Sequence, residues 1–586
     1  MLKIMKYISK KQWFYIGICL LFVVGQVWLD LKLPDYMSAI TTLVQTEGSA
    51  IENILTQGGY MLLCALGSVL SSIIVGYFAA KVAAGLSKTL RGKVYGKALG
   101  FSMEEIDRFS AASLMNRTTN DITQIQNLVA MGLQTIVKAP IMAMWAICKI
   151  AGKNWQWTAT TAIAVFILIL VLAITLFFAL PRFKKIQRLT DNLNRVTREQ
   201  LTGIRVVRAY NAESYQENKF AAANAEITRT NMVANRVMAL MSPTMTLLNS
   251  GLTLAVYWIG TYLIDAVSQS EKLGVFSDMV VFSNYAIQVI MAFMLLNMIF
   301  ILLPRAQVSA NRICEVLDTK TNICDGQKSF SKKERGTVEF RNVSFRYPGA
   351  AADTLHNISF AATQGETVAL IGATGCGKTT LINLIPRFYD AAHGQVLVDG
   401  IDVRECRQEE LRNKIGYVSQ KALLFSGTVT SNVAFGKNGK EAVTEQDVKE
   451  AVSVAQASEF VEKMEGTYSA AIAQGGSNVS GGQKQRISIA RAIARKPEIL
   501  IFDDSFSALD YKTDRTLRFA LNEKTADTTK LIVAQRISTI RDADQIIVLD
   551  HGRIVGKGTH EELLANCPEY LEIAASQLSK EEIENG

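Results

Sequence analysis

The chain has 586 residues, which is too long for one hydrophobic core, so at least two domains are expected. Hydrophobic residues make up 49% of it and the mean hydropathy is +0.17, which is above the average of soluble proteins. The net charge is +9, and the eight cysteines show no paired spacing, which excludes a disulfide framework and indicates free thiols in a reducing compartment.

Long apolar runs are concentrated in the first 305 residues. A bilayer span needs about 20 mostly apolar residues, and six runs there reach that length. Buried helices of a soluble core would not account for six such runs. We expect transmembrane helices near 13–33, 58–80, 130–150, 158–180, 238–264 and 276–303.

Basic residues predict how these spans are oriented. They cluster before the first span, after the second and after the fourth, whereas the loops at 34–57 and 265–275 carry almost none. By the positive-inside rule, both termini and the C-terminal half of the chain are cytoplasmic. The same loops explain the net positive charge better than nucleic-acid binding does. Lys149 lies near the outer end of the third span, where we expect its amine to reach the interface.

Two connections between spans are long, polar and compatible with helices. No proline occurs between positions 81 and 139 or between 182 and 242. The neighbouring spans are therefore expected to continue as helices into the cytoplasm. They should turn near Asp107–Asp121 and Gly203–Gln216, and these turns are candidates for docking on a soluble domain.

A phosphate-binding motif follows the change of composition after Arg312. The stretch "GATGCGKTT" matches G-x-x-x-x-G-K-[ST], and it lies between the apolar run "TVALI" and the helical "TLINLI". Glycines there let backbone N–H groups turn toward phosphate oxygens, Lys378 would reach the β- and γ-phosphates, and Thr379 would bind Mg²⁺. The candidate nucleotide-binding residues of this loop are Gly372, Thr374, Gly375, Gly377, Lys378, Thr379 and Thr380.

Two further segments belong to the same chemistry. The apolar run "EILIFDD" ends in Asp503, a candidate Mg²⁺ ligand. Between it and the first motif lies "NVSGGQKQR", in which Ser480, Gly481 and Gly482 precede a helix rich in Arg and Ala. A helix N-terminus is an anion site. Because the chain already has one phosphate cradle, a second one predicts a nucleotide shared between two chains.

The segment "VSGGQKQR" between these two motifs resembles the signature sequence of ABC transporters. With six spans before the nucleotide domain, essentially the whole chain resembles an ABC exporter half-transporter. The resemblance implies an all-α six-helix transmembrane domain with long cytoplasmic extensions at 1–315, a linker at 316–336, an α/β P-loop ABC nucleotide-binding domain at 337–576 and a C-terminal tail at 577–586. It implies ATP and Mg²⁺ as cofactors and a plasma (inner) membrane location.

Further residues match the family's motifs. Tyr347 in "FRYPG" resembles the aromatic residue that stacks on adenine, and Gln420 in "YVSQ" resembles the Q-loop glutamine that contacts Mg²⁺. The family's X-loop and D-loop correspond to Ala473–Gly476 and Ser507–Asp510. In the family, the signature of one chain covers the nucleotide on the other, which implies that role for Ser480, Gly481, Gly482 and Gln483. The two cytoplasmic turns resemble coupling helices.

Two positions depart from the family pattern. Asp504 stands where the catalytic Glu is usual, and Gln535 stands where the switch histidine is usual; none of the four histidines lies at that position. One methylene less withdraws the carboxylate by roughly 1 Å, a displacement that costs on the order of 10²-fold in other active sites. A glutamine can bond a phosphate but cannot carry an imidazole's charge. Together the changes predict a site that binds ATP and hydrolyses it slowly.

The signature, in contrast, keeps its serine and both glycines. This asymmetry resembles the degenerate-site subunit of heterodimeric bacterial multidrug-type ABC exporters, and it implies a second half-transporter with consensus Glu and His as the partner. A slowly hydrolysing homodimer and an ATP-gated regulatory membrane protein are the alternatives. The expected substrate is a hydrophobic or amphipathic small molecule, with lipid, peptide and porphyrin left open. Met and aromatic residues of the spans could line its path or simply pack helices.

Overall fold

The computed structural model describes residues 2–46, 49–151, 154–269, 271–330, 335–439 and 442–578. It divides into two compact units. One comprises Met1–Leu99 and Ala111–Thr319 and is helical; the other comprises Gly100–Ser110 and Lys320–Gly586 and contains the β-sheets. The short segment Gly100–Ser110 therefore belongs with the second unit although it lies within the expected transmembrane domain at 1–315.

The helical unit contains a candidate membrane-spanning helix for each of the six predicted spans. Among the described residues, six helical stretches are long and apolar enough to cross a membrane: Lys10–Gln45, Ile51–Leu99, Ala111–Ile150, Trp155–Thr202, Glu213–Asp265 and Lys272–Leu295. Each predicted span overlaps one of them, and the sixth, expected at 276–303, overlaps Lys272–Leu295. The helices of this unit are α1 (Leu2–Met5), α2 (Lys10–Gln45), α3 (Ile51–Leu99), α5 (Ala111–Asn116), the π-helix η1 (Arg117–Asp121), α6 (Ile122–Ala151), α7 (Trp155–Thr202), α8 (Ile204–Ala209), α9 (Glu213–Ala239), α10 (Met241–Asp265) and α11 (Lys272–Asp318).

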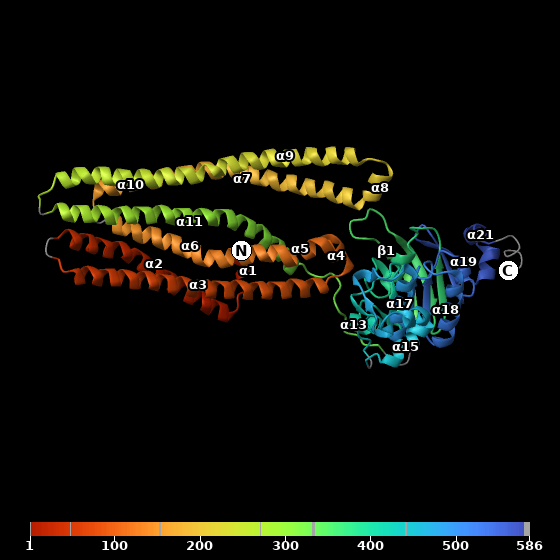
Figure 1. Ribbon diagram of the computed structural model, residues 1–586. Coiled ribbons are helices and arrows are strands. Elements are labelled where there is room, and N and C mark those ends of the chain that lie inside the picture. The colour runs from red at the N-terminus through yellow and green to blue at the C-terminus, as the bar shows by residue number, and fades with distance from the viewer. Residues whose placement is uncertain are drawn as a thin grey trace. The chain divides into compact units, whose positions relative to one another are not determined.

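These helices pack side by side along their lengths (Figure 1). Helix α2 lies along α3, α6 packs against α3 and α11, α7 pairs with α9, and α10 contacts both α7 and α11. Many large apolar side chains stay on the surface, among them Leu62, Leu66 and Leu70 of α3 and Phe166 of α7. Such a surface suits helices surrounded by lipid, where apolar side chains need no protein cover.

The sequence predicted the positions of the two long turns with different accuracy. The second is confirmed, since α7 ends at Thr202, α8 follows, and α9 begins at Glu213. The first was placed too late: the chain turns after Leu99 into α4 (Met103–Phe109), and most of the expected turn is helical. Glu105 explains this start, because its carboxylate accepts from the backbone N–H of Ser102 at 2.7 Å and caps α4.

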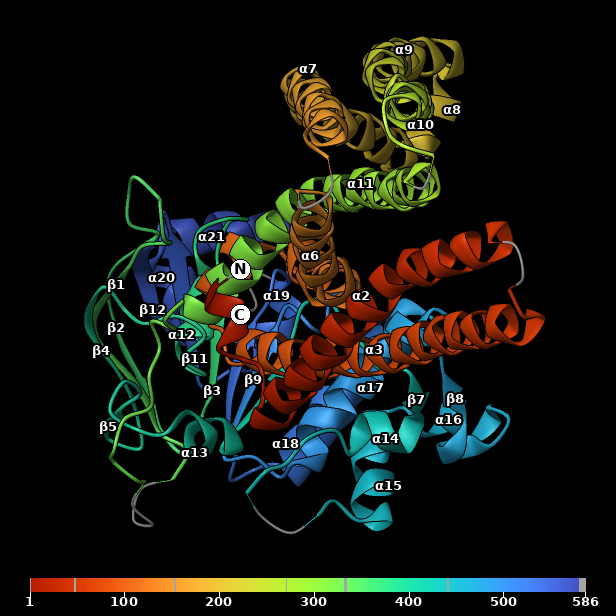
Figure 2. The same ribbon diagram turned by 90° about the vertical axis from the view of Figure 1, so that its left-hand side faces the viewer.

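The second unit holds three sheets (Figure 2). The antiparallel sheet has the order β2-β1-β4-β5, the main sheet β12-β11-β3-β10-β9-β6, and a small one pairs β7 with β8. Their strands are β1 (Val338–Phe345), β2 (Leu355–Ala362), β3 (Thr367–Ile371), β4 (His393–Val398), β5 (Ile401–Asp402), β6 (Ile415–Val418), β7 (Gly427–Thr428), β8 (Ala471–Ile472), β9 (Ile499–Asp503), β10 (Thr529–Val533), β11 (Gln545–Asp550) and β12 (Arg553–Gly558).

The remaining α-helices of this unit pack against the main sheet or against one another. They are α12 (Lys378–Leu384), α13 (Gln408–Asn413), α14 (Val429–Val433), α15 (Glu445–Val454), α16 (Ser458–Lys463), α17 (Gly481–Ala494), α18 (Tyr511–Lys524), α19 (Ile537–Ile540), α20 (His560–Asn566) and α21 (Pro568–Ala575). The strands from β11 to β6 run parallel, and β9 and β10 are buried along their whole lengths. This confirms the predicted α/β nucleotide-binding fold.

Candidate nucleotide-binding site

The register of three neighbouring strands brings the candidate residues together. Strand β10 lies between β3 and β9, and Val533 pairs with Leu370 on one side and with Asp503 on the other. All three strands are parallel, so the residues that follow them emerge at one edge of the sheet. The carboxyl edge of a parallel sheet is where such folds bind ligands.

A glycine-rich loop follows β3 at this edge. Gly372 has φ 149° and Gly377 has φ 105°, which only glycine adopts without strain, and a Cβ on Gly372 would fall 2.0 Å from the carbonyl oxygen of Leu549. A Cβ on Gly375 would meet nothing within 4 Å, so the space above the loop is open. The amine of Lys378, a buried residue, donates to the carbonyls of Gly372 at 2.7 Å and Ala373 at 2.9 Å. The loop thus combines open space, turned backbone and a cation, as a phosphate cradle requires.

The hydroxyl of Thr379 and the carboxylate of Asp503 already face each other. Thr379 Oγ1 donates to Asp503 Oδ1 at 2.8 Å. Burial raises the pKa of the Asp503 carboxyl, and the Thr379 hydrogen bond partly opposes that shift. Oxygen donors of this kind suit Mg²⁺, so the residues fit an ATP-bound magnesium ion, which would neutralise phosphate charge. On the same loop, Thr380 Oγ1 lies 2.9 Å from the hydroxyl of Tyr347.

The residues that depart from the family pattern contact each other directly. Asp504 is buried and left-handed, with φ 47°. Its Oδ2 accepts a hydrogen bond from Gln535 Nε2 at 2.8 Å and is 3.3 Å from Gln420 Nε2. Both donors are neutral amides. The structure therefore joins the three residues that the sequence proposed for hydrolysis, and both hydrogen bonds to the Oδ2 atom of Asp504 come from neutral amides, which cannot take up a proton at neutral pH.

The signature segment forms an ordered, exposed helix start. Ser480 caps α17 through a reciprocal pair: its N–H donates to Gln483 Oε1 at 2.9 Å, and its Oγ accepts from the N–H of Gln483 at 3.4 Å. A Cβ on Gly481 would meet nothing within 4 Å, and one on Gly482 would come only to 3.4 Å from a carbonyl oxygen. No hydrogen bond among the described residues joins Ser480–Gln483 to Lys378, Asp503 or Asp504. The segment keeps its small side chains and free surface for a ligand.

The backbone around Gln535 is held by a residue that sequence reasoning missed. Gln577 Nε2 donates to the carbonyl of Gln535 at 2.9 Å, and Gln577 Oε1 accepts from the N–H of Ile537 at 2.9 Å. One side chain thus bonds the backbone on both sides of Arg536, and this pair of hydrogen bonds is called the Gln577 bracket. Gln577 is the first residue of the expected C-terminal tail and belongs to no motif, so only the tertiary structure reveals this contact.

Helix α4 contacts the nucleotide-binding residues through two links within the second unit. The carboxylates of Glu104 and Glu105 accept from the side chain and the backbone N–H of Asn322 at 2.8 Å and 3.1 Å. Asp107 accepts from the hydroxyl of Tyr389 at 3.3 Å, and burial together with the Asp107 charge raises the pKa of Tyr389 to about 12. The Tyr389 ring packs edge-on against Tyr347, with centroids 5.3 Å apart. A chain of contacts therefore runs from α4 to the phosphate loop.

Comparison with known proteins agrees with this geometry. Residues 16–293 match the family model described as "ABC transporter transmembrane region", and residues 355–507 match the model described as "ABC transporter". The chain belongs to the ABC transporter family. It contains a helical transmembrane domain and an ATP-binding domain in one chain and is an ATP-driven exporter embedded in the membrane.

Three relatives illustrate the range of the family. An uncharacterised ABC transporter ATP-binding protein of Mycobacterium tuberculosis is 42% identical over 521 residues, which is 89% of this chain and 87% of that protein. The ATP-dependent lipid A-core flippase of Pseudomonas aeruginosa is 31% identical over 527 residues, 89% of this chain and 85% of the flippase. Among solved structures, a bacterial Atm1-family ABC exporter with ATP bound superimposes with a TM-score of 0.79 at 25% identity, over 97% of this chain and 100% of that one.

Proposed function

We propose that this chain is the slow-site subunit of a heterodimeric ABC exporter. Its Walker motifs bind ATP, its signature segment completes the faster site on a partner half-transporter, and the partner carries the consensus Glu and His. The cargo is a hydrophobic or amphipathic small molecule, and one relative is a lipid A-core flippase. Both termini and the nucleotide-binding domain are cytoplasmic in this proposal, in a plasma (inner) membrane.

The hydrogen bond between Asp504 and Gln535 carries the proposal. In a hydrolysing site the acid after β9 has to polarise a water, and the residue after β10 has to contact the γ-phosphate. Here the shorter carboxylate accepts from Gln535 at 2.8 Å, and Gln420 lies within 3.3 Å of the same oxygen. A water would have to displace an amide to reach that oxygen. Neither amide can take up a proton in exchange, so turnover at this site is slow.

The ATP-binding half of the same site supports the other part of the proposal. The glycine loop, Lys378 and the Thr379–Asp503 pair have the positions that ATP and Mg²⁺ require. The exposed start of α17 with its small residues Ser480, Gly481 and Gly482 suits a γ-phosphate presented by a second chain. In this proposal the chain supplies an intact signature segment to the nucleotide site of its partner. To its own nucleotide site it supplies residues that bind ATP but hydrolyse it slowly.

The partner can be found directly. The tagged full-length chain is purified in mild detergent from cells that express it natively, and stoichiometric companions are identified by mass spectrometry. We expect one second half-transporter whose sequence has Glu after the Walker B Asp and His at the switch position. Recovery of a dimer of this chain alone, with no second half-transporter, would contradict the heterodimer and favour the slow homodimer.

A further inference from the structure

A cavity within the helical unit contains charged groups that the nucleotide chemistry does not use. It has a volume of about 510 Å³ and is lined by side chains of α2, α6 and α11. Its apolar part consists of Met142, Met291, Met294 and two leucines; its polar part consists of Asp30, Lys138 and Gln288. By contrast, Met241, Met245 and Phe282 are buried in the helix core.

Asp30 and Lys138 form an ion pair inside two predicted spans, 13–33 and 130–150. Lys138 Nζ donates to Asp30 Oδ2 at 3.0 Å, and both side chains are about three-quarters buried. Ionisable groups at membrane depth are costly and mark functional sites by default. A second ion pair serves for comparison with Asp30 and Lys138: Lys149 pairs with Asp35 at 2.9 Å but does not line the cavity.

The hydrogen bonds of this pair show which charge a ligand would need. Both oxygens of Asp30 already accept, one from Lys138 and the other from Ser68. Lys138 has three N–H donors and makes one hydrogen bond among the described residues, so it keeps donors for an acceptor in the cavity. The Oε1 atom of Gln288 is buried without a partner among the described residues. An amide rotation would let it accept from a ligand hydroxyl.

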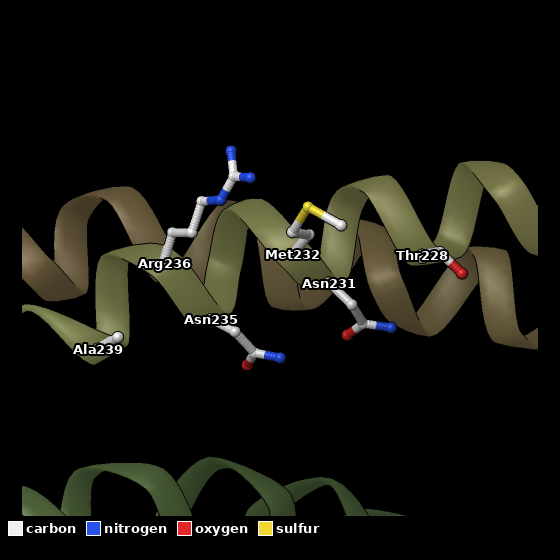
Figure 3. A pocket seen from close by; sticks show the side chains of 6 residues that line it. All are labelled: Thr228, Asn231, Met232, Asn235, Arg236 and Ala239. Carbon is white, nitrogen blue, oxygen red and sulfur yellow. The ribbon is translucent and has the colours of Figure 1, made fainter.

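A second hollow of similar size lies on one helix only. It is lined by Thr228, Asn231, Met232, Asn235, Arg236 and Ala239, all from α9 (Figure 3). Figure 3 shows Asn231 and Asn235 directed to one side and Met232 and Arg236 to the other. Among the described residues, the lining of this hollow comes from α9 alone, so a ligand would be held from one side. The cavity between α2, α6 and α11 is the better-built site.

We propose that this cavity binds an amphipath with an acidic, hydroxyl-bearing head group, such as a monoalkyl phosphate. The phosphate oxygens accept from Lys138, the P–OH donates to Gln288, and the alkyl chain lies along the methionines. The proposal rests on the proposed export function, whose cargo class it narrows. Methionine side chains adapt to alkyl chains of different shape, which suits such a ligand.

Binding of radiolabelled dodecyl phosphate, below its micellar concentration, tests the proposal on the full-length chain in phosphatidylcholine nanodiscs, with empty nanodiscs as background. We expect saturable binding that Lys138→Gln weakens about tenfold or more, because a charge-assisted hydrogen bond is lost. Lys138→Arg and the matched control Lys149→Gln should bind within about threefold of wild type. Asp30→Asn should tighten binding, because it removes the negative charge that pairs with Lys138 and leaves the Lys138 amine in place.

Competitors separate the possible sources of the ligand. Excess dodecyltrimethylammonium should not displace the probe. Reduced probe binding in nanodiscs that contain phosphatidic acid would identify the membrane as the source, and unchanged binding would identify the aqueous phase; both agree with the proposed head group. Displacement by inorganic phosphate at equal concentration, or equal binding by wild type, Lys138→Gln and Asp30→Asn, would overturn it. ATP binding and hydrolysis measured on the same samples show whether the proposed export function fails separately.

Discussion

The phosphate loop after β3 and the corner formed by Asp504 and Gln535 after β9 and β10 lie at one edge of one sheet. They differ in how many of the family's usual residues they keep. The loop has its glycines, its lysine and a threonine already bonded to Asp503 at 2.8 Å. The corner has the same backbone positions filled by Asp504 and Gln535, which bond to each other. In the proposed account, two side chains separate nucleotide binding from nucleotide hydrolysis without any change of fold.

The largest effect is expected from a substitution in the phosphate loop, which should weaken ATP binding. Lys378→Ala removes the cation that lies over the glycine loop, and we expect ATP affinity to fall on the order of 10²-fold, as loss of a charge-assisted phosphate contact predicts. Equilibrium binding of a fluorescent ATP analogue measures it. Lys557→Ala, which removes an exposed lysine of β12, is the matched control and should bind as wild type does. Unchanged affinity in Lys378→Ala would place the nucleotide elsewhere.

The second prediction restores the family's usual residues at positions 504 and 535. Asp504→Glu combined with Gln535→His returns the longer carboxylate and the imidazole, and we expect the rate of ATP hydrolysis to rise by about 10²-fold with affinity little changed. Asp504→Asn, made alone, should leave the low wild-type rate nearly unchanged. A large fall in Asp504→Asn would mean that Asp504 is already an effective catalytic group.

The signature segment tests whether the intact half serves another chain. In Gly481→Val, the new side chain meets nothing within 4 Å at its Cβ in this chain, so folding and ATP binding by the isolated chain should be unaffected. The ATPase rate of the assembled transporter should fall about tenfold, because the valine would occupy space needed by the partner's nucleotide. ATP binding by the isolated variant serves as the control for folding, and a normal ATPase rate in the complex would refute the shared site.

The smallest effect is expected at the bracket around Arg536. Gln577→Ala removes two hydrogen bonds to the backbone on either side of Arg536, each worth about 1 kcal/mol. Amide exchange of Ile537 should then quicken severalfold, while ATP affinity stays within about twofold. Ser576→Ala, whose hydroxyl bonds only within its own helix, is the matched control. Equal exchange in the two variants would show that Gln577 does not position this loop.

Much of this site was predictable because its parts are local in sequence. Short motifs next to a strand or helix identify the glycine loop, the segment "EILIFDD" and the signature. The six spans are recognised by the length of their apolar runs. The contact between Asp504 and Gln535 was not predictable as geometry, since it depends on the alignment of β9 with β10. The Gln577 bracket and the Asp30–Lys138 pair join residues far apart in sequence, so no local pattern contains them.

The first of the two long turns shows another limit of sequence reasoning. Its predicted range was Asp107–Asp121. The structure instead starts a capped helix at Met103 and keeps residues 111–121 helical. The cap between Ser102 and Glu105 decides this, and a serine three residues before a glutamate is a signal that the sequence did contain.

One measurement tests the central claim most directly: ATP binding and Mg²⁺-dependent ATP hydrolysis by the purified full-length chain alone in lipid, on the same sample. The account predicts saturable ATP binding without appreciable turnover. Robust turnover by the wild-type chain would show that Asp504 and Gln535 are serviceable catalytic residues, and it would contradict the slow-site subunit.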